Sequence, residues 1–349
     1  MDGLLALTPA LRNKALKMTA HIAINGFGRI GRTVLRTLLL SGRTDLQVVA
    51  INDPADTATL AHLFEYDSLH GRFPGTVDCD GTSLTVNGRP IAVTNISDSD
   101  TLDWSGVDLV VESSGHFTRK SDALRHIDRG AGKVLISAPA KDDVKTIIYG
   151  VNHRDISAQD RVISNASCTT NCLVPMVKVL DDAFGVVRGM MTTVHCYTRS
   201  QSTHDGPHED LYRARAAALS MVPTTSGAAI AMGQVLPHLA GRITGQAIRV
   251  PTPNVSCIDL TVEVATGTTP QEINALFTDA VAGEMQGILG TTDKKLVSAD
   301  FRNAPESGVM ALDQTRVQSH TLVRVLAWYD NEWGFAHRMA DTASVMASA

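Results

Sequence analysis

The sequence predicts an α/β protein in which a Rossmann-type doubly wound parallel sheet domain is followed by a mixed α/β catalytic domain. Three observations favour this fold class. Short apolar runs alternate with helical patterns over the first half, a glycine-rich motif directly follows the first run, and longer apolar strands replace this rhythm after about residue 165. With 349 residues, of which 44% are hydrophobic, the chain is long enough for about two domains.

The first half reads as a series of βαβ units. Strands are expected at His21–Asn25, Leu46–Asn52, Asp108–Glu112, Lys133–Ser137, Thr146–Tyr149 and Arg161–Ser164, and helices at Arg29–Leu40, Thr57–Tyr66 and Ser121–Arg129. Because each helix separates two apolar strands, the strands are expected to run parallel in one sheet.

The second half predicts a different arrangement. Strands are expected at Gly189–Cys196, Ala247–Val250, Cys257–Val264 and Thr321–Tyr329, with helices at Pro270–Glu284 and Phe335–Ala347. We therefore expect an N-terminal extension over residues 1–18, a nucleotide-binding domain over 19–166, a catalytic domain over 167–331 and a C-terminal helix over 332–349 that packs back on the nucleotide-binding domain.

Composition and charge exclude several classes of function. The net charge is −5 and no long basic run occurs, so nucleic acid is not an expected partner. The chain has no apolar stretch long enough to cross a bilayer, and residues 1–18 lack the basic start of a signal peptide. Five cysteines without a CxxC pair favour a reducing, cytoplasmic location and no metal site.

The glycine motif predicts a dinucleotide-binding turn. It has the form G-x-G-x-x-G, lies between the first expected strand and helix, and comprises Gly26, Phe27, Gly28, Arg29, Ile30 and Gly31. Gly26 permits a tight turn, Gly28 lets a pyrophosphate approach the backbone, and Gly31 allows the helix to pack closely on the sheet. Backbone N–H groups at the helix N-terminus would hold the phosphates.

Asp53 completes the nucleotide-binding pattern. It follows the second expected strand, 22 residues after Gly31, where a carboxylate can accept hydrogen bonds from the adenosine ribose. A negative charge there disfavours the 2′-phosphate of NADP, so NAD is the expected cofactor. The alternative is a glycine-rich turn with an unrelated aspartate.

A candidate nucleophile, Cys168, lies where a strand pattern gives way to a helical one. Hydroxylated residues surround it, and a helix N-terminus stabilises a thiolate and lowers the thiol pKa. We expect the helix to continue through Pro175. His195, at the end of the expected strand Gly189–Cys196, is the best placed of the twelve histidines to act as its base. A buried structural cysteine and a structural histidine are the alternatives.

From about His21 to the C-terminus the chain resembles the phosphorylating glyceraldehyde-3-phosphate dehydrogenases. The resemblance rests on the segments Ala23–Arg32, Ser164–Asn171, Thr192–His195, Arg249–Val255 and Trp328–Glu332. It implies that NAD is the cofactor and that D-glyceraldehyde 3-phosphate and inorganic phosphate are converted to 1,3-bisphosphoglycerate in glycolysis or gluconeogenesis. Cys168 would form the thioacyl intermediate, with His195 as its acid–base partner.

The resemblance also implies further site residues and a homotetramer. Substrate phosphate would bind at Thr198, Ser200 and Arg249, and inorganic phosphate at Ser167, Thr169, Arg215, Ser226 and Gly227. The cofactor would additionally contact Ser114, Gly115 and Ser137, and Asn331 would orient the nicotinamide carboxamide. Three positions depart from the family pattern: Ser97, where arginine is frequent, Phe335, where tyrosine is frequent, and Ser226, where threonine is frequent.

Two other functions compete with this interpretation. Erythrose-4-phosphate dehydrogenase shares the Cys/His pair and the ending Asn331–Phe335, but Thr198 and the segment Thr224–Ala229 look like the phosphate sites of the glyceraldehyde enzyme. A catalytically idle NAD-binding protein could keep the fold alone. The intact pair of Cys168 and His195 argues against that alternative.

Overall fold

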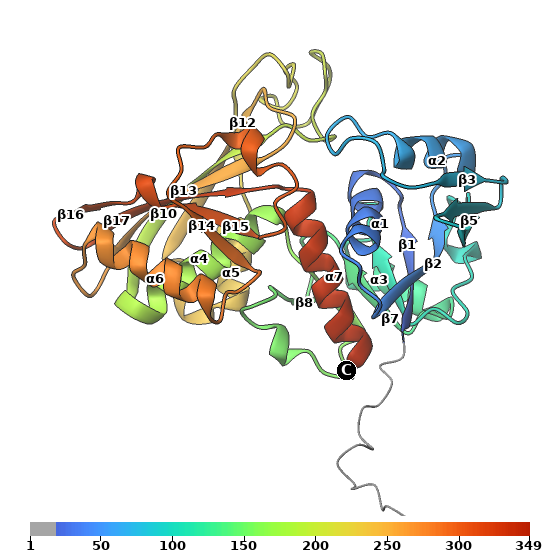
Figure 1. Cartoon of the computed structure of the whole chain (residues 1–349), viewed down its shortest axis with the longest axis horizontal. Helices are drawn as coiled ribbons and strands as arrows, with labels where there is room; N and C mark the ends of the chain where they lie inside the picture. The colour runs from blue at the N-terminus through green and yellow to red at the C-terminus, as the bar shows by residue number, and fades with distance from the viewer. Residues whose placement is uncertain (1–18) are drawn as a thin grey trace, which may run out of the picture.

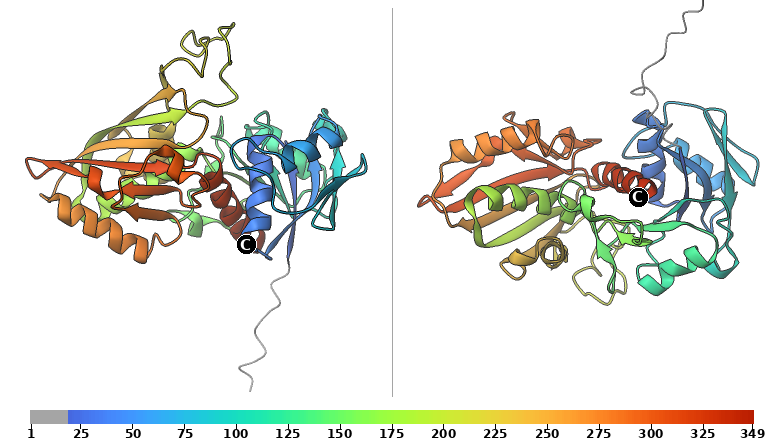
Figure 2. Two further views of the ribbon diagram at one scale, coloured as in Figure 1. Left: turned by 45° about the horizontal axis from the view of Figure 1, so that its top comes forward. Right: turned by 90° about the horizontal axis from the view of Figure 1, so that it is seen from below.

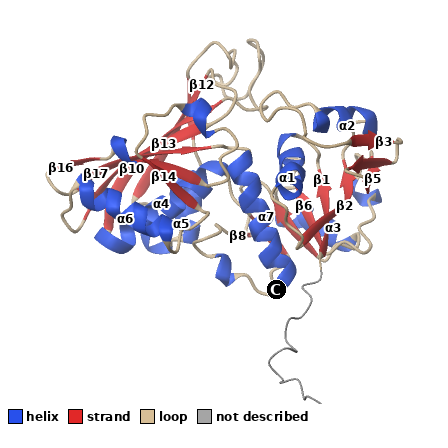
Figure 3. Cartoon of the chain, viewed as in Figure 1, coloured by secondary structure: helices blue, strands red, loops and turns tan. Residues whose placement is uncertain are grey.

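The computed structural model describes residues 19–349 and contains two sheets with a helix between them (Figure 1). The expected extension, residues 1–18, lies outside the described residues. The fold is the predicted one: a largely parallel, Rossmann-like sheet and a second, mixed sheet. Figure 3 shows the helices arranged around both sheets.

The first sheet has nine strands within the described residues. In spatial order they are β3 (Val77–Cys79), β4 (Ser83–Val86), β5 (Arg89–Thr94), β2 (Leu46–Asn52), β1 (Ala20–Asn25), β6 (Leu109–Glu112), β7 (Lys133–Ile136), β9 (Val162–Ser164) and β8 (Lys145–Thr146). The antiparallel pairs β3/β4 and β4/β5 lie at one edge, and the other pairs are parallel. The carboxyl ends of the central strands therefore meet at one edge of the sheet.

Helices cover both faces of this sheet. Apolar side chains alternate between the two faces, so each face needs a covering layer. On β1, Ile22 and Ile24 belong to one core and Ala23 to the other. The first face is covered by α1 (Arg29–Leu40), α2 (Thr57–Glu65) and α7 (Trp333–Ser348), and the second by α3 (Lys120–Asp128). Burial on both faces explains why these strands read as continuous apolar runs.

The second sheet is mixed. Its strands within residues 19–349 are, in spatial order, β11 (Val222–Thr225), β12 (Ile243–Val250), β10 (Val186–Cys196), β13 (Ser256–Val264), β17 (Leu322–Tyr329), β15 (Gly308–Ala311) and β14 (Leu289–Thr292), with β16 (Arg316–Gln318) paired to β17. One face packs on α4 (Cys168–Phe184), α5 (Ala228–Val235) and α6 (Pro270–Ala282). Alternate residues of β13 and β17 are therefore buried.

The helix α7 lies between the two sheets (Figures 1 and 2). Its apolar residues Phe335, Met339 and Met346 join the core formed by the first sheet and α1. It also contacts α4 of the second part of the chain. The last helix thus completes a core that the first strands begin.

One expected strand is wrong. The sequence predicts a strand at Thr146–Tyr149, but β8 ends at Thr146. Asn152 explains the difference, because its side chain accepts the Ile148 N–H at 2.8 Å and donates to the Thr146 carbonyl at 2.9 Å. This local side-chain pairing closes a turn instead of extending the strand.

Candidate active site

The glycine turn between β1 and α1 is shaped by two close approaches. Gly26 has φ +90°, and a Cβ there would lie 2.4 Å from the Ser114 nitrogen. A Cβ on Gly31 would lie 2.2 Å from the carbonyl oxygen of Gly26. Both positions therefore require glycine. At Gly28, by contrast, no atom of residues 19–349 outside the adjoining stretch of chain comes within 4 Å of the Cβ position.

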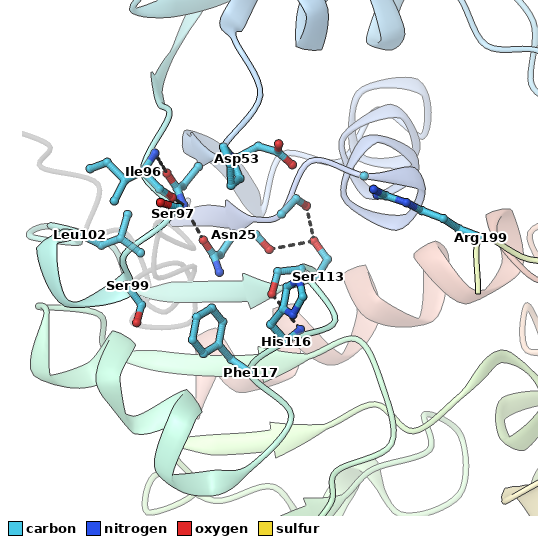
Figure 4. A pocket seen from close by; sticks show the side chains of 15 residues that line it. Asn25, Asp53, Ile96, Ser97, Ser99, Leu102, Ser113, His116, Phe117 and Arg199 are labelled. Atoms are coloured by element: carbon cyan, nitrogen blue, oxygen red, sulfur yellow. Dashed lines mark hydrogen bonds between the residues drawn. The ribbon is translucent and has the colours of Figure 1, made fainter. Parts of the chain in front are cut away.

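The open side of this turn faces a cavity of about 510 Å³. Gly26, Gly28, Asp53 and Ser114 are among its lining residues, together with Ser97 and Arg199. Figure 4 shows Asp53 on one side, His116 and Phe117 on another, and Arg199 extending toward the cavity from a different segment. The predicted turn, acid and serine therefore surround one cavity, which is large enough to take part of a dinucleotide.

Asp53 is fixed by backbone donors. Its carboxylate accepts the Phe27 N–H at 2.8 Å and the Ala55 N–H at 3.0 Å. These bonds join the end of β2 to the glycine turn and leave other lone pairs of the carboxylate for a ligand. The α1 N-terminus has no side-chain cap at Gly28 and no acidic residue in its first turn, within the part of the chain described. Its N–H groups are therefore available to an anion.

A second cavity, of about 580 Å³, adjoins the same turn and shares Gly28, Asp53 and Arg199 with the first. Phe27, Gly28, Arg29 and Thr198 line it, and so does Arg199. Arg29 bonds Glu332 and Asp67, at the start of α7 and after α2, so its guanidinium ties together segments that flank the cavity. Ile30 packs against the core beneath α1.

Cys168 is the first residue of α4, as the sequence predicts. The Ser167 hydroxyl caps the helix by accepting the Thr170 N–H at 3.1 Å, and the helix continues through Pro175. Ala166 connects β9 to this cap with φ +55°, an unfavourable conformation for a residue with a Cβ. The chain is thus bent sharply so that the thiol stands at the helix N-terminus.

The base expected for Cys168 lies beside it. His195 Nε2 is 3.5 Å from Cys168 Sγ, and the imidazole is only 4% exposed. These side chains come from a helix and a strand, and Arg249 on the neighbouring strand β12 places Nη1 2.6 Å from His195 Nδ1. The register pairs His195 with Arg249, which explains that contact.

Burial and Arg249 set the charge of this pair. Burial raises the pKa of the Cys168 thiol, and the Arg249 guanidinium partly offsets it. Burial and the Arg249 charge lower the pKa of His195 to about 3. Near neutral pH both groups are therefore uncharged. The expectation of a thiol pKa lowered by the helix N-terminus omitted this burial.

Arg249 also selects the tautomer of His195. A guanidinium can only donate, so Nδ1 accepts and the ring proton lies on Nε2, facing the thiol. The Cys196 carbonyl, 2.7 Å from Nδ1 and 2.9 Å from Arg249 Nη1, then accepts from the arginine. If Arg249 moved away, Nδ1–H could donate to that carbonyl instead.

Asn331 is held with its amide oxygen occupied. Oδ1 accepts the Val255 N–H at 3.1 Å and the Cys196 S–H at 3.1 Å. Val255 has φ +66°, which is strained for a β-branched residue. The two donors leave the Asn331 NH₂ group to donate to a ligand.

The residues expected to bind phosphate fall into separate groups. Thr198 and Ser200 share a hydrogen bond of 3.0 Å, and the Ser226 hydroxyl accepts from the first N–H of α5, next to Gly227. Thr169 Oγ1 is 2.9 Å from the buried Tyr329 hydroxyl. Arg215 bonds Asp205 at 2.8 Å, and its side chain is 65% exposed. That ion pair draws Arg215 toward solvent.

Comparison with known proteins identifies the family. A model of the NAD binding domain of glyceraldehyde 3-phosphate dehydrogenase matches residues 20–120, and a model of the C-terminal domain of the same family matches residues 167–331. The chain belongs to the glyceraldehyde-3-phosphate dehydrogenase family.

Curated members of the glyceraldehyde-3-phosphate dehydrogenase family match nearly the whole chain. The protein of that name from Cereibacter sphaeroides is 55% identical over 94% of this chain and 99% of its own length. Those from Xanthobacter flavus and Pseudomonas aeruginosa are 54% and 53% identical, over 94% and 95% of this chain and 99% of their own lengths. As a member of this family the chain is an NAD-dependent oxidoreductase.

The described residues fit NAD. Open space at Gly28, the uncapped α1 N-terminus and the Asp53 carboxylate suit a pyrophosphate and a ribose around one cavity. When bound, the nicotinamide supplies the hydride acceptor. Gly115 has φ +79° in the turn after Ser114, and Ser137 donates its N–H to the Glu112 carbonyl at the end of β6. Neither is among the residues that line the two cavities at the glycine turn.

Two arginines were missed by the sequence analysis. Arg199 lines both cavities beside the glycine turn, and Arg213 donates to the Thr224 hydroxyl on β11 at 3.0 Å. Arg199 stands between the expected phosphate residues Thr198 and Ser200, which was a usable signal. The sequence alone does not show which of Arg213 and Arg215 lies near Ser226, because the two differ in the direction of their side chains, and that direction is known only from the structure.

Proposed function

We propose that this chain catalyses the NAD-dependent oxidation of D-glyceraldehyde 3-phosphate, with inorganic phosphate, to 1,3-bisphosphoglycerate. The observation that carries the proposal is the Cys168 thiol at a helix N-terminus, 3.5 Å from His195 Nε2. A nucleophile paired with a base suits a reaction through a covalent acyl intermediate. The names of the curated relatives support the substrate.

Cys168 Sγ would attack the aldehyde carbon. A C–S bond forms, the thiol proton leaves, and the carbonyl oxygen gains a proton to give a hemithioacetal. Loss of the carbon-bound hydrogen as hydride, which bound NAD would accept, would leave a thioester on Cys168, while His195 takes the hydroxyl proton. A phosphate oxygen then attacks the thioester carbon, the C–S bond breaks and the acyl phosphate departs.

Arg249 would couple substrate binding to this chemistry. Arg249 donates to His195 Nδ1, so the imidazole presents Nε2–H and not a lone pair to the thiol. A substrate phosphate that draws Arg249 away would let Nδ1–H donate to the Cys196 carbonyl. His195 would then present a lone pair at Nε2 and could accept the thiol proton.

The two phosphate groups would bind in different places. We assign the substrate phosphate to Thr198, Ser200 and Arg249, and the inorganic phosphate to Ser167, Thr169, Ser226 and Gly227. Both arginines pair with an aspartate, Arg213 with Asp210 and Arg215 with Asp205. Arg213 is the better candidate for the second group, because it also bonds Thr224 near Ser226 and its side chain is 26% exposed against 65% for Arg215. Arginine forks and hydroxyls suit phosphate oxygens.

A homotetramer is part of the proposal. The long segment between β10 and β11 projects from the second sheet, at the top of Figure 1. It carries four large apolar side chains that are 62–82% exposed: Leu211, Tyr212, Leu219 and Met221. A concentration of exposed apolar groups of this size is typical of a protein interface.

We also propose that the domains divide near residues 166 and 331.

A cytoplasmic location is proposed for this enzyme. All five cysteines are free thiols, which is consistent with a reducing compartment. Among the described residues, no helix is long and apolar enough to span a membrane.

The test is NADH formation with glyceraldehyde 3-phosphate or erythrose 4-phosphate, each with and without inorganic phosphate. We expect phosphate-dependent reduction of NAD with glyceraldehyde 3-phosphate. A preference for erythrose 4-phosphate without a phosphate requirement would overturn the substrate assignment.

Replacing the nucleophile tests the mechanism. Cys168→Ser should lower turnover by at least about a thousandfold, because a neutral hydroxyl is a poor nucleophile, while NAD affinity changes little. NAD binding is measured by calorimetry alongside the rate. Retained turnover in this variant would rule out the covalent mechanism.

A further inference from the structure

A row of polar side chains crosses the carboxyl edge of the first sheet. Thr94, Asn52, Asn25 and Glu112 end the adjacent strands β5, β2, β1 and β6. The register pairs Thr94 with Asn52, Asn52 with Asn25, and Asn25 with Glu112. Register partners of parallel strands point to the same face, so these side chains stand in one line. Asn25, Asn52 and Glu112 are 2–3% exposed.

The hydrogen bonds along this row all point toward Glu112. Thr94 Oγ1 donates to Asn52 Oδ1 at 2.9 Å, Asn52 Nδ2 donates to Asn25 Oδ1 at 2.9 Å, and Asn25 Nδ2 donates to Glu112 Oε2 at 2.6 Å. The Ile96 N–H also donates to Asn52 Oδ1, at 3.0 Å. Each amide therefore has a single consistent orientation.

A second chain of donors reaches Glu112 from the other side. The indole N–H of Trp104 donates to His126 Nδ1 at 3.0 Å, and His126 Nε2 is 3.0 Å from Glu112 Oε2. An indole can only donate, so Nδ1 must accept and the ring proton must lie on Nε2. His126 is fully buried and Trp104 is 2% exposed. The carboxylate thus receives donors from both directions.

The remaining oxygen of Glu112 holds the wall of the nucleotide cavity. Oε1 accepts the Ser114 N–H at 2.7 Å and also accepts the Ser114 hydroxyl. Ser114 is the residue whose backbone would meet a Cβ on Gly26. Asn25, Asn52 and Ser114 line the cavity together with Asp53. Glu112 lies beneath this surface, and four donor groups, from Asn25, His126 and twice from Ser114, fix its carboxylate and with it the position of the wall.

We propose that Glu112, with His126 and Trp104 behind it, is the positioning group for the adenosine half of NAD. This inference rests on the proposed use of the Asp53 cavity for that half. An acceptor-only carboxylate is required at this place, because every group that hydrogen-bonds the Glu112 carboxylate is a donor. Neither the glycine motif nor Asp53 supplies that anchor.

The test is Glu112→Gln, which keeps the shape but turns one oxygen into a donor. In either orientation the NH₂ group of the glutamine then faces another hydrogen-bond donor. Two buried donors that face each other cost enough free energy to alter the affinity about ten- to a hundredfold. We expect the Kd of ADP-ribose, measured by calorimetry, and the KM of NAD to rise by that factor. The kcat at saturating NAD and the alkylation rate of Cys168 in NAD-free enzyme should change less than about twofold.

Two further variants complete the experiment. Trp104→Phe keeps the ring but removes the donor to His126, and should raise the ADP-ribose Kd about three- to tenfold. Glu263→Gln, on β13 and paired at the surface with Arg188, is the matched control and should bind like wild type.

The outcomes separate this inference from the proposed function. Wild-type affinity for ADP-ribose in Glu112→Gln and Trp104→Phe would overturn the inference, even with a lowered melting temperature, since the row would then be only structural. If Glu112→Gln did not fold, Trp104→Phe would decide alone. Failure of wild type to bind ADP-ribose would overturn the cofactor site itself.

Discussion

At the scale of single residues, two glycines of one turn have opposite surroundings. The Cβ of Gly31→Ala would meet a backbone oxygen at 2.2 Å, whereas that of Gly28→Ala enters open space. We expect Gly31→Ala to lower the free energy of unfolding by about 1–3 kcal/mol, as overpacking does. Gly28→Ala should leave stability nearly unchanged and weaken NAD binding by about tenfold or more. Urea unfolding and calorimetry measure the two effects, and equal stability losses would contradict the prediction.

Arg249 gives a prediction for pH dependence. Its charge lowers the pKa of Cys168 against the effect of burial, so in a His195→Gln background, where no imidazole can take the thiol proton, Arg249→Leu should raise that pKa further. Iodoacetamide alkylation of Cys168 in NAD-free enzyme should then shift its midpoint to higher pH and become slower at pH 8. Arg188→Leu, at an exposed ion pair, serves as the control. A midpoint that is unchanged or lower would show that Arg249 does not stabilise the thiolate.

Local sequence predicted part of the site and not its tertiary contacts. The position of Cys168 at the start of a helix follows from its neighbours, because capping is a local property. The contact between His195 and Arg249 depends on the pairing of β10 with β12, 54 residues apart in sequence. Burial, which reverses the expected shift of the thiol pKa, depends on the whole core and leaves no local pattern.

At the scale of elements, long and strongly patterned segments were predicted well. The helix Arg29–Leu40 and the strand Leu46–Asn52 have the expected bounds. The antiparallel strands β3, β4 and β5 were missed because polar residues and Pro90 interrupt them. Asn87 and Gly88 between β4 and β5 both have positive φ, as a two-residue hairpin turn requires. That pair was the available signal.

The helix α7 carries a histidine that should destabilise the protein in acid. Burial, and next the charge of Arg338, lower the pKa of His337 from 6.5 to about 4. Between these values the unfolded chain binds a proton that the folded chain does not, so stability falls as pH falls through this range. His337→Gln should flatten that part of the stability curve, measured by urea unfolding from pH 7 to pH 4.5. An equally steep curve in the variant would contradict this.

At the scale of the whole molecule, the exposed apolar side chains between β10 and β11 predict an assembly. Leu219 and Met221 are 82% and 74% exposed. Replacing both with glutamate should split the oligomer, because charges at an apolar interface must be desolvated. Light scattering measures the mass. The control is Leu322→Glu, at an exposed apolar residue of β17, which should leave the assembly intact. A wild-type protein that is a monomer in solution would contradict the proposed assembly.

The position of α7 has a consequence for the synthesis of the chain. Phe335, Met339 and Met346 belong to the core that begins with β1 and α1, so the first domain to leave the ribosome lacks part of its interior until α7 has emerged as well. We infer that this domain becomes fully stable only after α7 has been synthesised and has packed against it. A chain truncated before Trp333 would then be degraded rapidly, although every residue of the glycine turn and the Cys168 helix is present.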